Sequence, residues 1–249
     1  MMLGEFTAIG EILKVMPGFA PTAYAWGKYE SDHQNNTYFL LSDFLEMDMH
    51  DRSLPDPDEF CSKIAELHLK GLSPYGKFGF PVITYHGRFS HFCDRWDESW
   101  ATFMANLITN LLAFDQVNNG DWPELIAVGQ HCVTHVIPRL LGVLQSDGRS
   151  IQPCLIHGDL WEGNIGTDME TGNIVVYDAG SFFAHHEFEL GHWRCERHRI
   201  SSKLFRKTYL KYYPASDPVE EFDDRNRLYS LPSNIMYATQ APGAIERMV

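Results

Sequence analysis

The sequence is poor in basic charge and contains no long apolar run. Its 249 residues carry 20 Lys and Arg against 33 Asp and Glu, a formal net charge of −13. This deficit argues against a nucleic-acid-binding protein, because such proteins need a positively charged surface to meet the phosphates. No stretch approaches the roughly 18 uncharged apolar residues of a membrane-spanning helix, so no membrane segment is predicted.

Cysteine is also scarce, and no secretory signal is evident. The five cysteines are scattered and odd in number, which is typical of reduced thiols in the cytosol rather than of a disulfide framework. The N-terminus lacks a basic segment followed by a long apolar core. These absences predict a cytoplasmic protein. What is present, 44% hydrophobic residues, is enough for a real core in one or two domains.

The order of the predicted elements indicates an α+β protein. Apolar residues at helical spacing predict a helix over residues 4–16. Two strand-like runs and a polar linker come next, at residues 22–26, 37–42 and 43–58, with Asn35-Asn36 as the hairpin turn. The rest reads as helices, with a strand predicted over residues 173–177 and a polar helical region after residue 184.

Capping residues and apolar stripes place the predicted helices. Asp56 is expected to cap a helix that Gly71 ends. A continuous apolar stripe predicts the clearest helix over residues 98–114. Asp121 is expected to cap a further long helix that runs to Leu140.

Chemistry is concentrated between residues 155 and 190. His157-Gly158-Asp159 is followed by Asn164, and a strand rich in β-branched residues ends at Asp178. Phosphoryl transfer needs a carboxylate that orients the acceptor hydroxyl and takes its proton, which is the role expected of Asp159. It also needs oxygen ligands that hold Mg²⁺ against the phosphates of ATP, the role expected of Asn164 and Asp178. The spacing matches the catalytic loop of kinases.

The loop His157-Gly158-Asp159-Leu160-Trp161-x-Gly163-Asn164 resembles that of the fructosamine/ketosamine-3-kinase family. Three other segments, at residues 77–80, 177–183 and 186–190, resemble further motifs of that family. The resemblance extends from about residue 4 to the end of the chain. It implies a protein-kinase-like fold, with residues 1–47 as an incomplete N-lobe and residues 48–249 as a mainly helical C-lobe.

The resemblance also implies a substrate. It implies transfer of the ATP γ-phosphate to O3 of a ketosamine, a fructosamine or ribulosamine on a glycated protein or a small amine, and hence a deglycation repair kinase. The ketosamine nitrogen is basic, so a cleft containing Asp159 and Glu162 would suit it. Trp161 either offers a flat face to the sugar or packs within the loop, and His157 is assigned to the substrate side as well. A related kinase with another hydroxyl acceptor stays open, as does the oligomeric state.

The start of the chain raises a second hypothesis. By the resemblance, Glu5 falls where kinases have a helix glutamate at the nucleotide site, paired with a lysine on a preceding strand. Almost nothing precedes Glu5, so we expect the first N-lobe strands, the phosphate-covering loop and that lysine to be missing. Without these strands, we expect an open sheet edge and apolar surface. Without its lysine partner, Glu5 itself is expected to be solvated. Asp43-Phe44-Leu45 is the expected hinge that meets adenine through its backbone. An active kinase and a catalytically weak pseudokinase-like binding protein both remain possible.

Several other side chains receive structural interpretations. Five residues between 185 and 198 crowd together, but their spacing matches no common structural zinc pattern, and no zinc site is predicted. The basic residues between 194 and 207 are interpreted as a solvated helix face. Glu187 and Glu189 are interpreted as anchors of the catalytic loop, and His68 as a core histidine.

Overall fold

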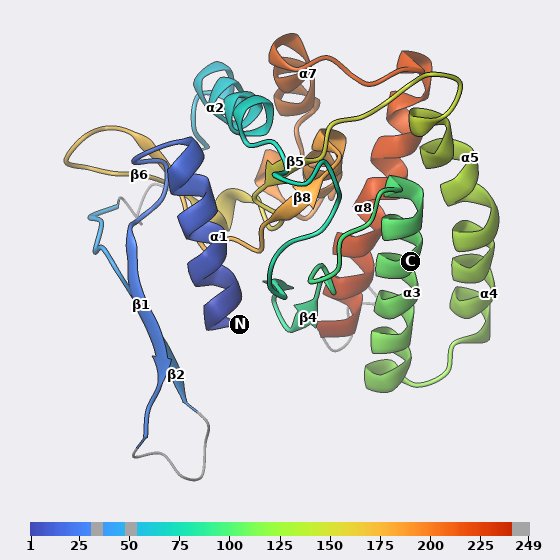
Figure 1. The fold of residues 1–249 in the computed structure, drawn as a ribbon, viewed down its shortest axis with the longest axis horizontal. Coiled ribbons are helices and arrows are strands. Elements are labelled where there is room, and N and C mark those ends of the chain that lie inside the picture. Colours follow the sequence, from blue (N-terminus) through green and yellow to red (C-terminus); the bar gives the residue numbers. More distant parts are fainter. Residues whose placement is uncertain (31–36, 48–53, 241–249) are drawn as a thin grey trace.

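The computed structural model describes residues 1–30, 37–47 and 54–240 (Figure 1). Within these residues the chain forms helices and short two-stranded antiparallel sheets, which confirms the α+β prediction. The predicted turn at Asn35-Asn36 lies outside the described residues. Among the described helices, none has the length and apolar character needed to cross a membrane.

The N-terminal part consists of a helix and a projecting hairpin. Helix α1 (Met2–Val15) buries Ala8, Ile9 and Ile12. Strands β1 (Ala23–Lys28) and β2 (Tyr38–Ser42) pair antiparallel and extend away from the body (Figure 1). Large apolar side chains on and next to this hairpin are exposed, namely Tyr24, Trp26, Tyr38, Leu41 and Phe44. The expected open apolar surface is therefore present.

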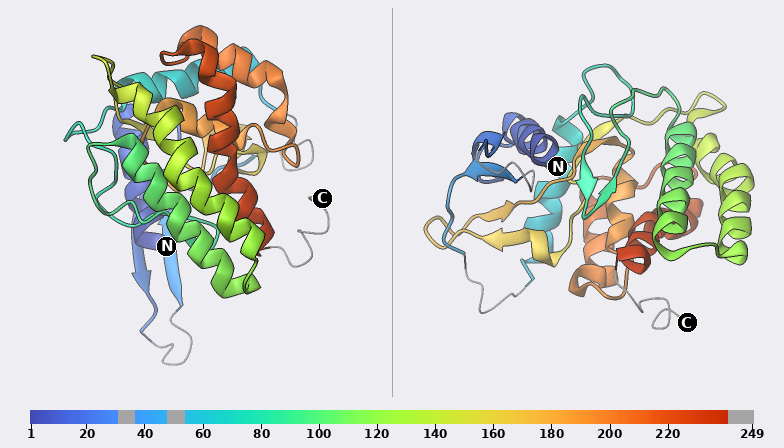
Figure 2. Two further views of the ribbon diagram at one scale, coloured as in Figure 1. Left: turned by 90° about the vertical axis from the view of Figure 1, so that its right-hand side faces the viewer. Right: turned by 90° about the horizontal axis from the view of Figure 1, so that it is seen from below.

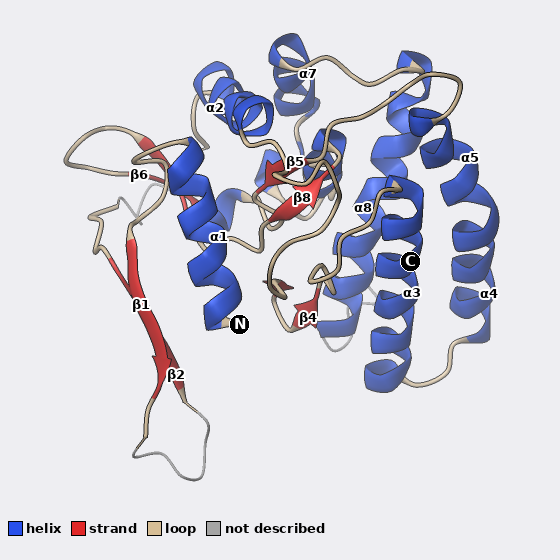
Figure 3. Ribbon diagram, in the orientation of Figure 1, coloured by secondary structure: helices blue, strands red, loops and turns tan. Residues whose placement is uncertain are grey.

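Helices make up most of the remaining body (Figures 2 and 3). They are α2 (Pro57–Lys70), α3 (Trp100–Asn119), α4 (Pro123–His131), α5 (Ile137–Leu141), α6 (Glu189–His192), α7 (Lys203–Tyr212) and α8 (Phe222–Gln240). Helix α8 packs on α3 and α6, and α2 packs on α7. Aromatic rings from α3 and from the segment before α6 fill the core, with Trp100 and Phe103 against Phe182 and Phe188.

The helix boundaries follow the capping chemistry in part. The Asp56 carboxylate accepts hydrogen bonds from the amides of Asp58 and Glu59, and Gly71 follows the last residue of α2, as predicted. Helix α3 continues past residue 114 because no breaking residue interrupts it before Gly120, whose φ is 82°.

The predicted cap at Asp121 is wrong. That carboxylate instead accepts a hydrogen bond from Gln116, and α4 begins after Trp122 without a side-chain cap. The long helix expected from there is continuous, but a π-helical turn (Cys132–Val136) joins α4 to α5. Pro138, just after this turn, has no amide hydrogen for the i−4 carbonyl, which explains the local rearrangement.

Three more strand pairs lie among the described residues of the body. They are β3 (Tyr85–His86) with β4 (Phe89–Ser90), β5 (Cys154–Ile156) with β8 (Phe182–Ala184), and β6 (Ile165–Thr167) with β7 (Ile174–Val176). Strand β7 lies within the predicted strand at 173–177. Asp168 holds the turn before it by accepting hydrogen bonds from the Glu170 amide and the Thr171 hydroxyl.

The interpretation of the basic residues near the C-terminus as solvated is partly wrong. Arg199, Lys203 and Lys207 are exposed, but Arg194, Arg197 and Arg206 are half-buried. Arg194 pairs with Asp223 on α8, and Arg197 donates to Ser233 and Asn234 of the same helix. These guanidinium groups connect the segment after α6 to α8 rather than facing solvent.

Candidate active site

The loop after β5 holds the central carboxylate in a fixed place. Gly158 has a φ of 83°, and a Cβ there would clash with the carbonyl oxygen of Gly180. Only glycine can adopt this positive φ without strain and also leave out the clashing Cβ. The loop therefore passes close under the segment before β8, and Asp159 follows directly at its tip.

Glu189 anchors this loop from α6, as the sequence suggested. Its carboxylate accepts hydrogen bonds from the amides of His157 (2.5 Å) and Gly158 (3.1 Å). Glu189 is 2% exposed, and the Nε2 atom of the buried His68 lies 3.6 Å from it. Hydrogen bonds from two amides to a buried charge are stronger than neutral ones, so the loop is held firmly to α6.

The β6–β7 hairpin brings Asn164 and Asp178 together. Asn164 precedes β6, Asp178 follows β7 by two residues, and the amide of Tyr177 donates to the Asn164 carbonyl at 3.1 Å. The Asn164 side-chain amide donates to the backbone carbonyl of Asp159 at 2.8 Å, which leaves its oxygen for another partner. Asp178 is exposed and adopts a φ of 57°, a strained conformation for a residue with a side chain.

Asp159 is the most perturbed carboxyl group of the site. It is 8% exposed, and its pKa rises from 3.8 to about 7, first because burial penalises the charge and then because Asp178 and Glu189 are nearby. Its Oδ1 atom has no hydrogen-bond partner among the described residues. A carboxylate with a pKa near neutrality is well matched to accept a proton.

A cavity of about 390 Å³ opens beside Asp159. Trp161 lines it and contacts His198, with ring centroids 5.3 Å apart. Helix α8 forms the opposite wall with Ser233, Met236 and Tyr237. Trp161 thus has one side available to a ligand, while the choice between a sugar contact and packing remains a prediction.

Two expectations about the substrate side are wrong. His157 is fully buried, its Nε2 lies 3.0 Å from the carbonyl of Tyr177, and its Nδ1 accepts from the Asp159 amide. It therefore positions the loop and cannot contact a substrate. Glu162 does not line the cavity, because its carboxylate accepts from the amides of Arg199 and Ile200.

The cavity instead carries imidazoles and one guanidinium. His86, His192 and His198 line it together with Arg197, whose charge lies over the ring of Tyr237 at 4.7 Å. Burial lowers the pKa of all three histidines, so they are neutral near pH 7. The positive charge in the wall is thus Arg197, contrary to the acidic cleft expected.

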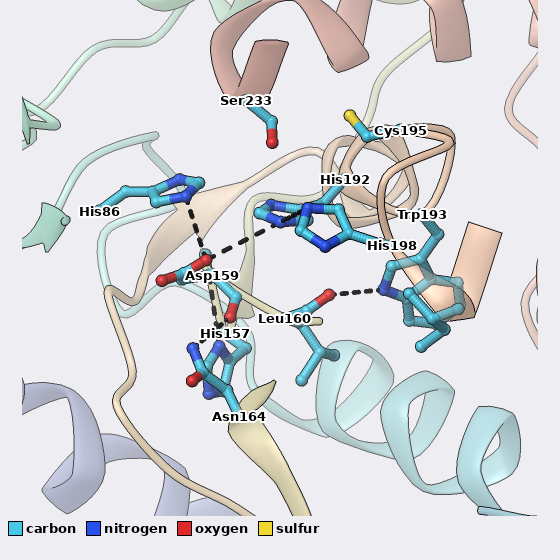
Figure 4. Close-up of polar contacts among 12 residues, drawn as sticks. His86, His157, Asp159, Leu160, Asn164, His192, Trp193, Cys195, His198 and Ser233 are labelled. Atoms are coloured by element: carbon cyan, nitrogen blue, oxygen red, sulfur yellow. Dashed lines mark hydrogen bonds and ion pairs between the residues drawn. The ribbon is translucent and has the colours of Figure 1, made fainter. Parts of the chain in front are cut away.

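The histidines between residues 185 and 198 lie in two different parts of the structure. His185 and His186 face the hydroxyl groups of Tyr229 and Tyr209 in the core. His192 and His198 face each other across 3.1 Å at the cavity (Figure 4). Sequence reasoning missed His86, because this residue reaches Asp159 from the β3–β4 hairpin, far away along the chain.

The nucleotide-side candidates lie around α1 and β2. Glu5 is half-buried, not solvated, and its pKa rises to about 7 through burial and the charge of Asp178. Asp43 accepts hydrogen bonds from the amide of Thr22 and the hydroxyl of Tyr24, whereas Phe44 is 92% exposed. The carboxylate of Asp43 is thus occupied, which leaves the backbone of this segment, Leu45 included, for the predicted adenine contact.

A sequence model of the fructosamine kinase family matches residues 1–240. A chloroplastic protein-ribulosamine 3-kinase of Oryza sativa subsp. indica is 27% identical over 194 residues, which cover 78% of this chain and 51% of that protein. The chain spans about half the length of the curated relatives it matches.

Solved structures of similar proteins support the protein-kinase-like fold that the sequence predicted. A candidate fructosamine-3-kinase from Haemophilus somnus 129PT aligns with a TM-score of 0.71 at 20% identity, covering 96% of this chain and 72% of that one. An aminoglycoside phosphotransferase, solved as a ternary complex with AMP-PNP and hygromycin B, aligns at 0.59 and 14% identity, covering 95% and 75%. The protein-kinase-like fold is thereby confirmed.

Proposed function

The chain belongs to the fructosamine kinase family, and from this premise we propose that it transfers the γ-phosphate of ATP to O3 of ketosamines. The acceptors are fructosamines or ribulosamines on glycated proteins or small amines. Phosphorylation at O3 makes such adducts labile, so the proposed role is deglycation repair. One observation carries the proposal: a buried carboxylate at a cavity, Asp159, lies beside the paired oxygen donors Asn164 and Asp178.

The donor set fits Mg²⁺. An amide oxygen and an exposed carboxylate are the hard ligands that this ion takes, usually with water and substrate phosphates completing the shell. The bond from the Asn164 amide to the Asp159 carbonyl fixes which side of Asn164 faces outward. When bound, Mg²⁺ would neutralise charge on the phosphates. Glu5 and the segment 43–45 are the candidates for the rest of the nucleotide site.

The protein's own residues would then act on the acceptor. Asp159 accepts the proton of the attacking hydroxyl, and its raised pKa makes it an effective base near neutral pH. Glu189 and His157 hold the loop so that this carboxylate keeps its place. Trp161 offers an apolar face to the sugar, and the cavity bounded by α8 receives the amine substituent.

The test is Asp159→Asn in the full chain. With ATP, Mg²⁺ and a ribulosamine-bearing protein, we expect phosphate incorporation, followed by mass spectrometry, to fall about 10²- to 10⁴-fold, the usual contribution of a general base. Binding of Mg-ATP, followed by thermal unfolding, should persist. Asp121→Asn is the matched control, because this carboxylate lies between α3 and α4 and accepts a hydrogen bond from Gln116 there. Equal activity in Asp159→Asn would rule out the assignment.

A further inference from the structure

Three side chains from separate elements converge on one point of the cavity (Figure 4). His86 comes from β3, Asp159 from the loop after β5, and His192 from α6. The Nε2 atoms of His86 and His192 lie 3.1 and 3.9 Å from the same oxygen, Oδ1 of Asp159. The three ligand atoms lie within 4.8 Å of one another.

Oδ1 of Asp159 accepts no hydrogen bond within the described part of the chain, although Nε2 of His86 lies 3.1 Å from it. Asp159 is more than nine-tenths buried, yet its Oδ1 receives no hydrogen bond from the described residues. The 3.9 Å to His192 is too long for a hydrogen bond, and the rings of His86 and His192 stack at 5.0 Å. A buried oxygen left in this state is costly unless another group satisfies it.

We propose that His86, His192 and Asp159 form a binding site for a divalent transition-metal ion of the zinc class. Two imidazole nitrogens and one carboxylate oxygen are a common donor set for such ions. Ligands about 2.0–2.2 Å from a tetrahedral ion lie roughly 3.3–3.6 Å apart, between the two distances observed here. The cavity offers the remaining coordination position to water or to an acceptor.

The consequence for catalysis rests on the proposed function. An ion bound to Oδ1 engages the lone pair that would accept the proton of the acceptor hydroxyl. A metal ion bound at this site would therefore inhibit phosphoryl transfer. It is separate from the proposed Mg²⁺ ligands, Asn164 and Asp178, and its imidazoles do not suit Mg²⁺, which prefers oxygen.

The binding test does not depend on activity. Co²⁺ is titrated into the metal-free full chain, its visible absorption is recorded, and Zn²⁺ and then Mg²⁺ are added as competitors. We expect a one-to-one site, displacement by Zn²⁺ and none by Mg²⁺. His86→Ala and His192→Ala should each weaken Co²⁺ binding by more than about 100-fold, beyond the 10- to 100-fold typical of an outer-shell partner.

The chain supplies its own control. His131 and His135 form an exposed stacked pair on the surface, with ring centroids 4.5 Å apart, and can bind metal weakly. The double variant H131A/H135A should leave the one-to-one site unchanged. Loss of the Co²⁺ spectrum in H131A/H135A, or its persistence in a folded H86A, would overturn the proposal. His86 lies on a short hairpin and is half-buried, so H86A decides the matter even if H192A fails to fold.

The inhibitory consequence is measured separately. Zn²⁺ should inhibit phosphoryl transfer by the parent, and H86A should need at least tenfold more Zn²⁺ for the same inhibition. If the parent binds Co²⁺ as described, but the parent free of Co²⁺ and Zn²⁺ transfers no phosphate, the metal site is supported and the proposed function fails. If the parent is active and Zn²⁺ binds at this site without inhibiting, the inhibitory part fails.

Discussion

At the residue scale, the missing side chain at Gly163 decides where the indole of Trp161 lies. A Cβ at Gly163 would run into the Trp161 ring. We expect Gly163→Ala to displace the indole, to cost about 1–3 kcal/mol of unfolding free energy as an overpacked site, and to raise KM for the acceptor several-fold. The measurements are denaturant unfolding and steady-state kinetics with the acceptor varied.

Gly142→Ala is the matched control for this prediction. Gly142 has helical dihedral angles, and a Cβ there meets nothing within 4 Å. Alanine at such a position should leave the unfolding free energy unchanged or raise it by about 0.4–1 kcal/mol. A Gly163→Ala protein that behaves like Gly142→Ala would show that the indole has room to move.

The sequence predicted the grouping of Asp159, Asn164 and Asp178 because local spacing determines it. A loop and one hairpin suffice to bring those residues together. It mispredicted His157, because a motif does not reveal whether an imidazole faces the cavity or the backbone. It gave no sign of His86 as a site residue, since only the tertiary fold brings the β3–β4 hairpin to Asp159.

At the element scale, one ion pair fastens the segment before α6 to α8. Arg225 donates two hydrogen bonds to Glu187, at 2.7 and 2.8 Å, and both side chains are fully buried. Removing one partner leaves an uncompensated buried charge. We expect Glu187→Gln to lower the unfolding free energy by about 3–5 kcal/mol, measured by denaturant unfolding.

The neighbouring pair on α8 provides the comparison. Arg227 and Asp223 lie 3.0 Å apart, and their side chains are 65% and 59% exposed. Because solvent screens such a pair, Arg227→Met should change the unfolding free energy by less than about 1 kcal/mol. Similar losses in the two variants would mean that Arg225 finds a new partner when Glu187 is neutralised.

Elements with regular periodicity were predicted better than their ends. The apolar stripe of α3 and the Asp56 cap of α2 are local signals, and both elements were predicted. The failed cap at Asp121 and the π-helical turn before Pro138 depend on which neighbour completes a hydrogen bond. The arginines after α6 are half-buried because they contact α8, and this contact between distant parts of the chain has no local sequence signal.

At the scale of the whole molecule, buried histidines predict acid sensitivity. In the part of the chain that the structure describes, burial lowers the pKa of seven histidines: His86, His91, His157, His185, His186, His192 and His198. Below about pH 6.5 the unfolded chain binds protons at these positions and the folded chain does not, so the unfolding free energy falls as pH falls. We expect a loss of several kcal/mol between pH 7 and pH 5 in urea titrations.

Two carboxyl groups oppose this trend. The pKa values of Asp159 and Glu5 are raised to about 7, so both bind a proton in the folded state between about pH 4 and pH 7 and stabilise it as pH falls. Asp159→Asn should therefore make the acid sensitivity steeper, by up to about 1.4 kcal/mol per pH unit. An unfolding free energy that rises toward pH 5 in the parent would contradict the prediction for the histidines. An unchanged pH dependence in Asp159→Asn would contradict the raised pKa of Asp159.

The walls of the cavity beside Asp159 come from several separate parts of the chain. The loop after β5 supplies the carboxylate and the indole, whereas α8 supplies Ser233, Met236 and Tyr237. A substitution on α8 reshapes the space for an acceptor without displacing the proposed base. Under the proposed function, substitutions on α8 can therefore change which amine acceptor fits while the proposed base at Asp159 is kept, and α8 is where a redesign of acceptor choice should begin.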